Sequence, residues 1–130
     1  MTEPLSNKFN MADASDAYKV LYACSSRQLR SWIMRDTRTS TERISRSTHW
    51  LMDRGLLIKI DEKGKRRTLS YFVATELGRN YIIHEPVVGF RKFLGDYKEC
   101  ISNYSESNTE YYSLAIKYDM LNFVSTSKKS

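Results

Sequence analysis

The chain has 130 residues, of which 41% are hydrophobic and 28% are charged, with a formal net charge of +6. This is ordinary for one small domain that buries its own core, and the basic balance favours anionic partners such as nucleic acid or an acidic membrane face. No stretch approaches the roughly 20 apolar residues of a membrane-spanning helix, and residues 1–10 lack the apolar segment of a secretion signal, so we expect a cytoplasmic protein.

The first half of the chain predicts three helices after a flexible start at residues 1–10. The first covers residues 13–25, capped by Asp13, and the second covers residues 27–36, capped by Ser26. Their inward faces are expected from three- and four-residue spacing: Ala17, Val20, Leu21 and Cys24 on the first, with Leu29 and Ile33 on the second and Trp32 as a further candidate.

The third helix is predicted over residues 41–54. Either Thr39 or Ser40 would cap its start, and Gly55 stands where a helix end favours a positive φ. The inner stripe of this helix is expected to be Ile44, Thr48, Leu51 and Met52.

The periodicity then changes to that of a β-hairpin. Residues 56–60 and 68–73 are rich in β-branched and aromatic side chains, and the polar loop between them contains Gly64. Thr75 would cap a fourth helix through residue 84, and Pro86 marks a boundary. The inward residues of this helix are expected to be Leu77, Tyr81 and either Ile82 or Ile83.

The last third predicts a heptad seam and a final helix. Apolar and aromatic side chains recur at alternating spacings of three and four: Val87, Phe90, Leu94, Tyr97, Ile101 and Tyr104. After a polar break, residues 110–124 repeat such spacing, and residues 125–130 form a polar tail. Cys24 and Cys100 are expected to be reduced packing residues.

The order of these elements resembles the winged helix-turn-helix regulators of the MarR, PadR and ArsR type. Residues 40–57 (STERISRSTHWLMDRGLL) carry the resemblance, together with residues 75–78 (TELG) after the second strand. It covers residues 13–85 and implies a fold that is mainly α with a small β-hairpin. We expect a winged-helix domain over residues 11–85 and C-terminal dimerisation helices over residues 86–124.

Positive charge is concentrated where such a fold meets DNA. Residues 27–67 contain twelve Lys or Arg residues and five Asp or Glu residues. Their net charge, twelve minus five or +7, exceeds the +6 of the whole chain. In a helix-turn-helix the second helix enters the major groove, where arginine can read guanine. We expect Arg43 and Arg46 to read bases, although a merely solvated position is the alternative.

Other contacts would surround those two arginines. The predicted set on the same helix, for phosphates or base edges, is Thr41, Ser45 and His49. The hairpin loop is expected to act as the wing, which touches the minor groove or its phosphates, through Lys63, Lys65, Arg66 and Arg67. Arg27 and Arg30 would add phosphate contacts at the start of the second helix.

The C-terminal aromatic helices either cover the core or pair with a second chain. We expect a homodimer, because helix-turn-helix dimers read two half-sites. The predicted dimerisation residues are Phe90, Leu94, Tyr97, Ile101, Tyr111, Leu114, Tyr118 and Leu121.

Cysteine and histidine spacing predicts no metal site, and neither a phosphate-binding glycine loop nor a catalytic motif is present in the sequence. We therefore expect no cofactor and no enzymatic activity. The main hypothesis is a DNA-binding transcriptional regulator, in the form of a repressor, that binds double-stranded DNA as a homodimer. The alternative is a winged helix used for protein interaction or nucleoprotein assembly, without sequence-specific readout.

Overall fold

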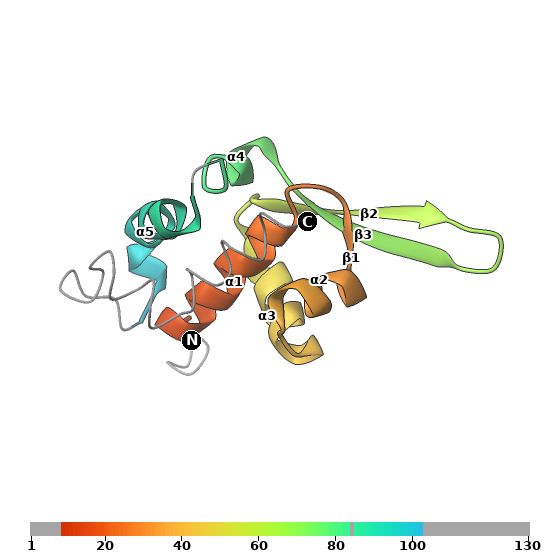
Figure 1. The fold of residues 1–130 in the computed structure, drawn as a ribbon, viewed down its shortest axis with the longest axis horizontal. Coiled ribbons are helices and arrows are strands. Elements are labelled where there is room, and N and C mark those ends of the chain that lie inside the picture. Colours follow the sequence, from red (N-terminus) through yellow and green to blue (C-terminus); the bar gives the residue numbers. More distant parts are fainter. Residues whose placement is uncertain (1–8, 84, 103–130) are drawn as a thin grey trace, which may run out of the picture.

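The computed structural model describes residues 9–83 and 85–102. A three-stranded antiparallel sheet of order β1-β3-β2 lies against a set of helices, and the β2-β3 hairpin projects from the body (Figure 1). The elements in chain order are α1 (Met11–Ala23), β1 (Gln28–Leu29), α2 (Arg30–Thr37), α3 (Thr41–Asp53), β2 (Leu57–Lys63), β3 (Thr68–Ala74), α4 (Glu76–Arg79), α5 (Pro86–Asp96) and a 3-10 turn (Lys98–Cys100). This is a mainly α fold with a small β-hairpin, arranged as a winged helix-turn-helix.

The first helix starts two residues earlier than predicted, and its cap is Asn10 rather than Asp13. The Asn10 side chain accepts from the Asp13 N–H at 2.8 Å, and the Asp13 carboxylate accepts from the Asn10 N–H at 3.3 Å. Together they form a capping box in which Asp13 is the third helical residue. The prediction of an Asp13 cap was wrong, because a better-placed acceptor precedes it.

The second helix begins later than predicted, and Ser26 does not cap it. Gln28 and Leu29 instead form β1, which pairs with Phe72 and Tyr71 of β3. Leu29 occupies the cap position of α2 without a side-chain hydrogen bond. Backbone pairing with a distant strand therefore takes the residues that local periodicity assigned to a helix. Of the predicted inward residues, Ile33 is fully buried, whereas Trp32 is 39% exposed.

The third helix agrees with its prediction. Ser40 is the cap, accepting from the Arg43 N–H at 3.3 Å, and Gly55 follows the helix end with a φ of +75°. Ile44, Thr48 and Leu51 are buried on its inner face. The short turn from α2 is made by Arg38, a residue other than glycine with a φ of +54° in the left-handed region.

The hairpin is longer than predicted, because β2 continues to Lys63. Its register pairs Leu57 with Ala74 and Lys63 with Thr68. The turn closes with a hydrogen bond from the Gly64 N–H to the Arg67 carbonyl at 2.8 Å. Four residues therefore remain outside the strands at the tip.

After the hairpin, Thr75 caps α4 as predicted, but this helix is short and ends at Arg79. Leu77 was predicted to point inward and is 47% exposed, whereas Tyr81 is buried. Gly78 allows α4 to approach the backbone just before β2 closely, because a Cβ there would lie 2.2 Å from the Leu56 carbonyl oxygen.

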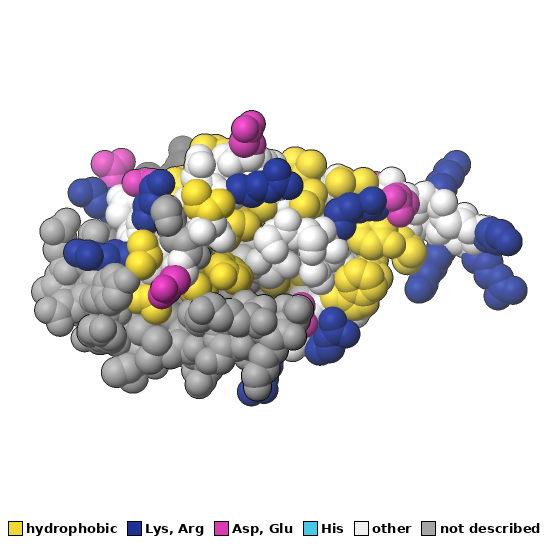
Figure 2. Space-filling view, turned by 45° about the horizontal axis from the view of Figure 1, so that its top comes forward, with side chains coloured by type: hydrophobic (Ala, Val, Ile, Leu, Met, Phe, Trp, Pro, Cys, Tyr) yellow, Lys and Arg dark blue, Asp and Glu magenta, His cyan; other side chains and the backbone are white. Residues whose placement is uncertain are grey.

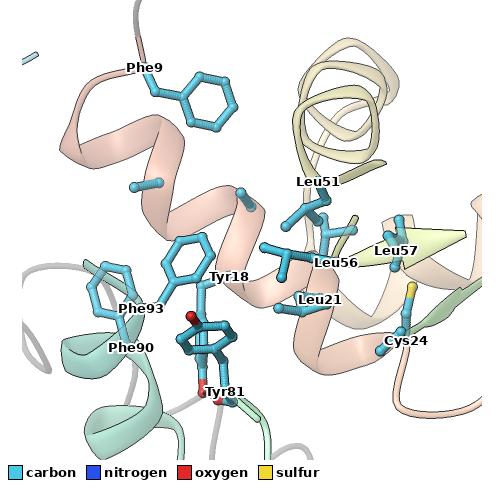
Figure 3. Close-up of a cluster of buried hydrophobic side chains, with 14 of the residues drawn as sticks. Phe9, Tyr18, Leu21, Cys24, Leu51, Leu56, Leu57, Tyr81, Phe90 and Phe93 are labelled. Carbon is cyan, nitrogen blue, oxygen red and sulfur yellow. Dashed lines mark hydrogen bonds between the residues drawn. The ribbon is translucent and has the colours of Figure 1, made fainter. Parts of the chain in front are cut away.

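The core is organised around α1, which lies between α5 on one side and the helix-turn-helix on the other (Figures 1 and 3). The Tyr18 ring lies 5.5 Å from Phe90 and 5.6 Å from Phe93, while Leu21 is directed toward Leu51 and Leu56 of the other half. Tyr18 donates its hydroxyl to the Tyr81 carbonyl at 2.5 Å, so this buried polar group is satisfied. Its burial raises the pKa of Tyr18.

The predicted heptad seam does not form one continuous helix. The α5 helix ends at Asp96, and Ile101 forms a parallel bridge with Phe9 near the start of α1. The prediction through Ile101 was wrong in this respect, because the chain turns at residues 97–100 to reach the N-terminal segment. Tyr104 and the predicted helix over residues 110–124 lie outside the described residues. Within the part of the chain that is described, no helix is both long enough and apolar enough to span a membrane.

Candidate nucleic-acid interface

The tip of the wing carries exposed cations at the far end of the hairpin. Figure 2 shows Lys and Arg side chains spreading from this end of the molecule. The four residues are Lys63, Lys65, Arg66 and Arg67, all of them exposed. Among the described residues, no Asp or Glu lies within ion-pair distance of any of the four. Their mutual repulsion therefore has no internal compensation.

The exposed arginines of α3, unlike the cations of the wing tip, form ion pairs with α1. Arg43 forms a bidentate pair with Asp16 of α1, through Nε to Oδ2 at 2.8 Å and Nη2 to Oδ1 at 2.5 Å. The Asp16 side chain is only 9% exposed. The hydrogen bond to Asp16 raises the pKa of Arg43.

Arg46, one helical turn further, reaches Asp13 of α1, with its Nη1 atom 3.0 Å from Oδ1. The sequence suggested Arg43 and Arg46 as base readers but did not identify their acidic partners. The available signal was the equal spacing of the two sets: Asp13 and Asp16 are three residues apart on α1, as are Arg43 and Arg46 on α3. Their roles at DNA stay predictions.

The other flank of α3 faces α2 and the base of the wing. Arg30 donates from Nη1 to the Ser45 hydroxyl at 2.5 Å, and its guanidinium lies 5.7 Å from the Phe72 ring centroid. The Thr41 hydroxyl donates to the Met34 sulfur at 3.3 Å. His49 is exposed, and its Nε2 lies 4.0 Å from the Asp53 carboxylate. Thr41, Ser45 and His49 thus lie on the flank that the α1 carboxylates leave free.

Arg27 links the body to the wing. It forms an ion pair with Glu62 of β2, and its guanidinium lies 4.6 Å from the Tyr71 ring centroid. Tyr71 in turn meets the edge of Trp32 at 6.3 Å. Arg27 was predicted to contact phosphate. The structure gives it an acidic partner that the sequence did not reveal, because Glu62 is distant along the chain.

The predicted dimerisation residues within the described region lie in the core of one chain. Phe90, Leu94 and Ile101 are at most 5% exposed, and Tyr97 packs partly buried against Phe93 at 5.4 Å. The burial of Phe90, Leu94 and Ile101 is nearly complete without a second chain. The others, Tyr111, Leu114, Tyr118 and Leu121, lie outside the described residues.

Cys24 is buried and Cys100 is half-buried, and both are free. Burial raises the pKa of the Cys24 thiol to about 12. In the described ranges no three His, Cys, Asp or Glu side chains come together to hold a metal ion.

Comparison with known proteins gives a likeness in structure and none in sequence. No protein-family model matches the chain, and no curated protein resembles it in sequence. The chain is similar in structure to the adhesin competence repressor (AdcR) from Streptococcus pyogenes, with 15% identity and a TM-score of 0.48, over 92% of this chain and 83% of that one. The element order and strand pairing of this chain are those of a winged helix-turn-helix.

Proposed function

We propose that this protein is a transcriptional regulator that binds duplex DNA, with α3 in the major groove and the wing tip on the adjacent backbone or minor groove. The observation that carries the proposal is the cluster of four exposed cations at the wing tip, which form no ion pair within the described residues. The same domain contains a helix-turn-helix whose second helix, α3, is capped by Ser40. DNA phosphates supply the opposite charge at high density, and neutralising them releases counterions. The fold needs no enzymatic activity or cofactor for this role.

The proposal assigns different work to the two elements. The wing tip contributes affinity through phosphates, which carries no sequence information by itself. The exposed flank of α3 offers Thr41, Ser45 and His49 to base edges or phosphates. Arg30 lies at the start of α2 beside Ser45 and is placed to contact phosphate from the same side.

A repressor acting as a homodimer in the cytoplasm is the finer form of this proposal. Two copies would double the phosphate contacts and read two half-sites. Because Phe90 and Leu94 are buried within one chain, pairing would use other surfaces. Apolar side chains exposed around α4 and α5 offer one such surface, namely Leu77, Ile83 and Val88.

The second candidate is a nucleoprotein-assembly or interaction module that holds DNA without reading its sequence. The pairing of Arg43 and Arg46 with carboxylates favours it, because the residue type that reads guanine most often is already paired with acids of its own chain. The wing would bind DNA in either case.

A salt titration separates these possibilities. We expect fluorescence anisotropy with a labelled duplex to give a log–log slope of about −4 to −7 for a dimer contacting roughly 5–8 phosphates. Absence of binding at low salt would refute both DNA-binding proposals. Competition with a pool of random duplexes, followed by selection and sequencing, distinguishes them: enrichment of one motif supports the regulator, and no enrichment supports the assembly module.

A further inference from the structure

Two ion pairs lie in parallel between α1 and α3. Asp16 binds Arg43 and Asp13 binds Arg46, so each helix contributes two residues spaced by one turn. The pairs have the same chemistry. They differ in which hydrogen bonds each carboxylate would keep if its arginine moved away. That difference decides which arginine a DNA phosphate can recruit.

In the Asp16–Arg43 pair, the arginine cannot readily leave its carboxylate for a DNA phosphate. Asp16 is buried, and among the described residues it has no other hydrogen-bond or ion-pair partner. Removing Arg43 would leave a buried carboxylate without compensation, which is strongly unfavourable. The two bonds of the fork also fix the guanidinium plane. Arg43 therefore stays with Asp16 and holds α3 against α1.

The Asp13–Arg46 pair is open to exchange. It has a single hydrogen bond at 3.0 Å. The two arginines are about equally exposed, at 60% for Arg46 and 55% for Arg43, whereas the Asp13 side chain is 16% exposed against 9% for Asp16. The other oxygen of Asp13 accepts from the Asn10 N–H in the capping box. Asp13 also stands in the first turn of α1, where the helix dipole stabilises a negative charge. Its carboxylate therefore remains satisfied when Arg46 leaves.

We infer that Asp13 competes with DNA phosphate for Arg46 and so weakens DNA binding, whereas Arg43 is a positioning residue that does not exchange. This inference rests on the proposed DNA binding and specifies which cation of α3 takes part. Arg46 swings from a carboxylate of its own chain to a phosphate of the DNA. The Asp13 carboxylate sets the cost of that exchange.

A double-mutant cycle tests the exchange by anisotropy with a non-specific duplex at low salt. The variants are Asp13→Asn, Arg46→Gln and the combination, with Glu42→Gln as the matched control, since it removes one exposed negative charge from α3 itself. Asparagine can still accept from the Asn10 N–H, so the cap is retained. Asp13→Asn should tighten binding about fivefold and steepen the salt slope by up to about 0.9, which corresponds to one additional phosphate contact.

In the Arg46→Gln background, we expect Asp13→Asn to change affinity no more than Glu42→Gln does. An equal gain in both backgrounds would mean a general charge effect and would overturn the inference. If Asp13→Asn does not fold, Arg46→Gln and Arg43→Gln decide: only the first should reduce the salt slope, and an equal reduction refutes the distinction. No DNA binding by the unmodified chain would be a failure of the proposed function instead.

Discussion

The α1–α3 interface and the wing both carry clustered arginines, but they use the charge in opposite ways. In the interface, Arg43 and Arg46 meet carboxylates of α1. At the wing tip, four cations stand within five residues, and none of them forms an ion pair in the part of the chain that the structure describes. The first arrangement stabilises the chain's own packing, and the second leaves charge available to a partner. Counting basic residues along the sequence cannot separate these two uses.

The same contrast extends to packing. The body surrounds α1 with aromatic and aliphatic side chains, whereas most of the wing beyond its base is exposed (Figures 2 and 3). Substitutions in the body should therefore change the free energy of unfolding, and substitutions at the wing tip should change DNA affinity alone. A wing-tip substitution that lowered stability, or a core substitution that changed DNA affinity alone, would break this division.

Gly89→Ala should have the largest effect on the body. A Cβ at this position would lie 2.1 Å from the Tyr18 hydroxyl and 2.2 Å from the Tyr81 carbonyl oxygen. Because it would disrupt the buried hydrogen bond between these groups, we expect a loss of about 3 kcal/mol or more in urea unfolding. Gly95→Ala in the same helix is the control: nothing lies within 4 Å of its Cβ, and stability should rise by up to about 1 kcal/mol. Equal effects would contradict the described packing of α5.

Arg43→Ala should cost about 2–3 kcal/mol of unfolding free energy, since it leaves the Asp16 carboxylate buried and unpaired. Arg46→Ala is the matched change and should cost about 0.5 kcal/mol or less, because Asp13 keeps its hydrogen bond from the Asn10 N–H and is more exposed than Asp16. Chemical denaturation of both variants measures the difference. If Arg43→Ala were as mild as Arg46→Ala, the interface would not depend on its charges.

Replacing Arg66 and Arg67 with glutamine should weaken DNA binding about 30-fold at 0.1 M salt and reduce the salt slope by about 1.8, as expected for two lost phosphate contacts. The unfolding free energy should stay within about 0.5 kcal/mol, because both side chains are exposed. The control replaces Arg79 and Arg91, two exposed arginines of α4 and α5, and should leave affinity nearly unchanged. An equal loss in the control would show that net charge, and not the wing, determines binding.

The buried groups of the body should also make the unfolding free energy depend on pH in the alkaline range. Burial raises the pKa of the Cys24 thiol to about 12 and raises the pKa of Tyr18 as well. Groups with a raised folded pKa contribute stability that is complete below their unfolded pKa and is lost as the pH rises above it. We expect the unfolding free energy to fall by about 2 kcal/mol between pH 7 and pH 10. Cys24→Ala should flatten this dependence, whatever its effect at pH 7, and an unchanged pH dependence would contradict the burial.

Arg38→Gly should have the smallest effect and the opposite sign. Arg38 adopts the left-handed region in the turn between α2 and α3, which costs a residue with a Cβ roughly 1 kcal/mol. Glycine removes this strain, so thermal unfolding should shift upward by a few degrees for a chain of this size. Arg35→Gly, inside α2, is the comparison and should lower stability. A loss in both would mean that the Arg38 side chain makes a contribution larger than its strain.

Local signals were sufficient for several elements. The Ser40 cap, the apolar spacing from Ile44 to Leu51 and the Gly55 stop predicted α3 to within one residue, because caps and periodicity depend on neighbours in the chain. The hairpin was predicted for the same reason, although β2 extends further toward its polar tip. The winged-helix order followed from these elements taken together.

The remaining features depended on residues that are distant in sequence. Gln28 and Leu29 form a strand only because β3 offers them a partner, and the seam after Pro86 ends because residue 101 returns to Phe9. The sequence by itself determined the α3 boundaries, the hairpin and the cationic tip of the wing. Only the tertiary structure decided which cations remain available to a partner. An arginine is paired or unpaired depending on whether another element brings a carboxylate beside it, and the carboxylates of α1 are distant from α3 along the chain.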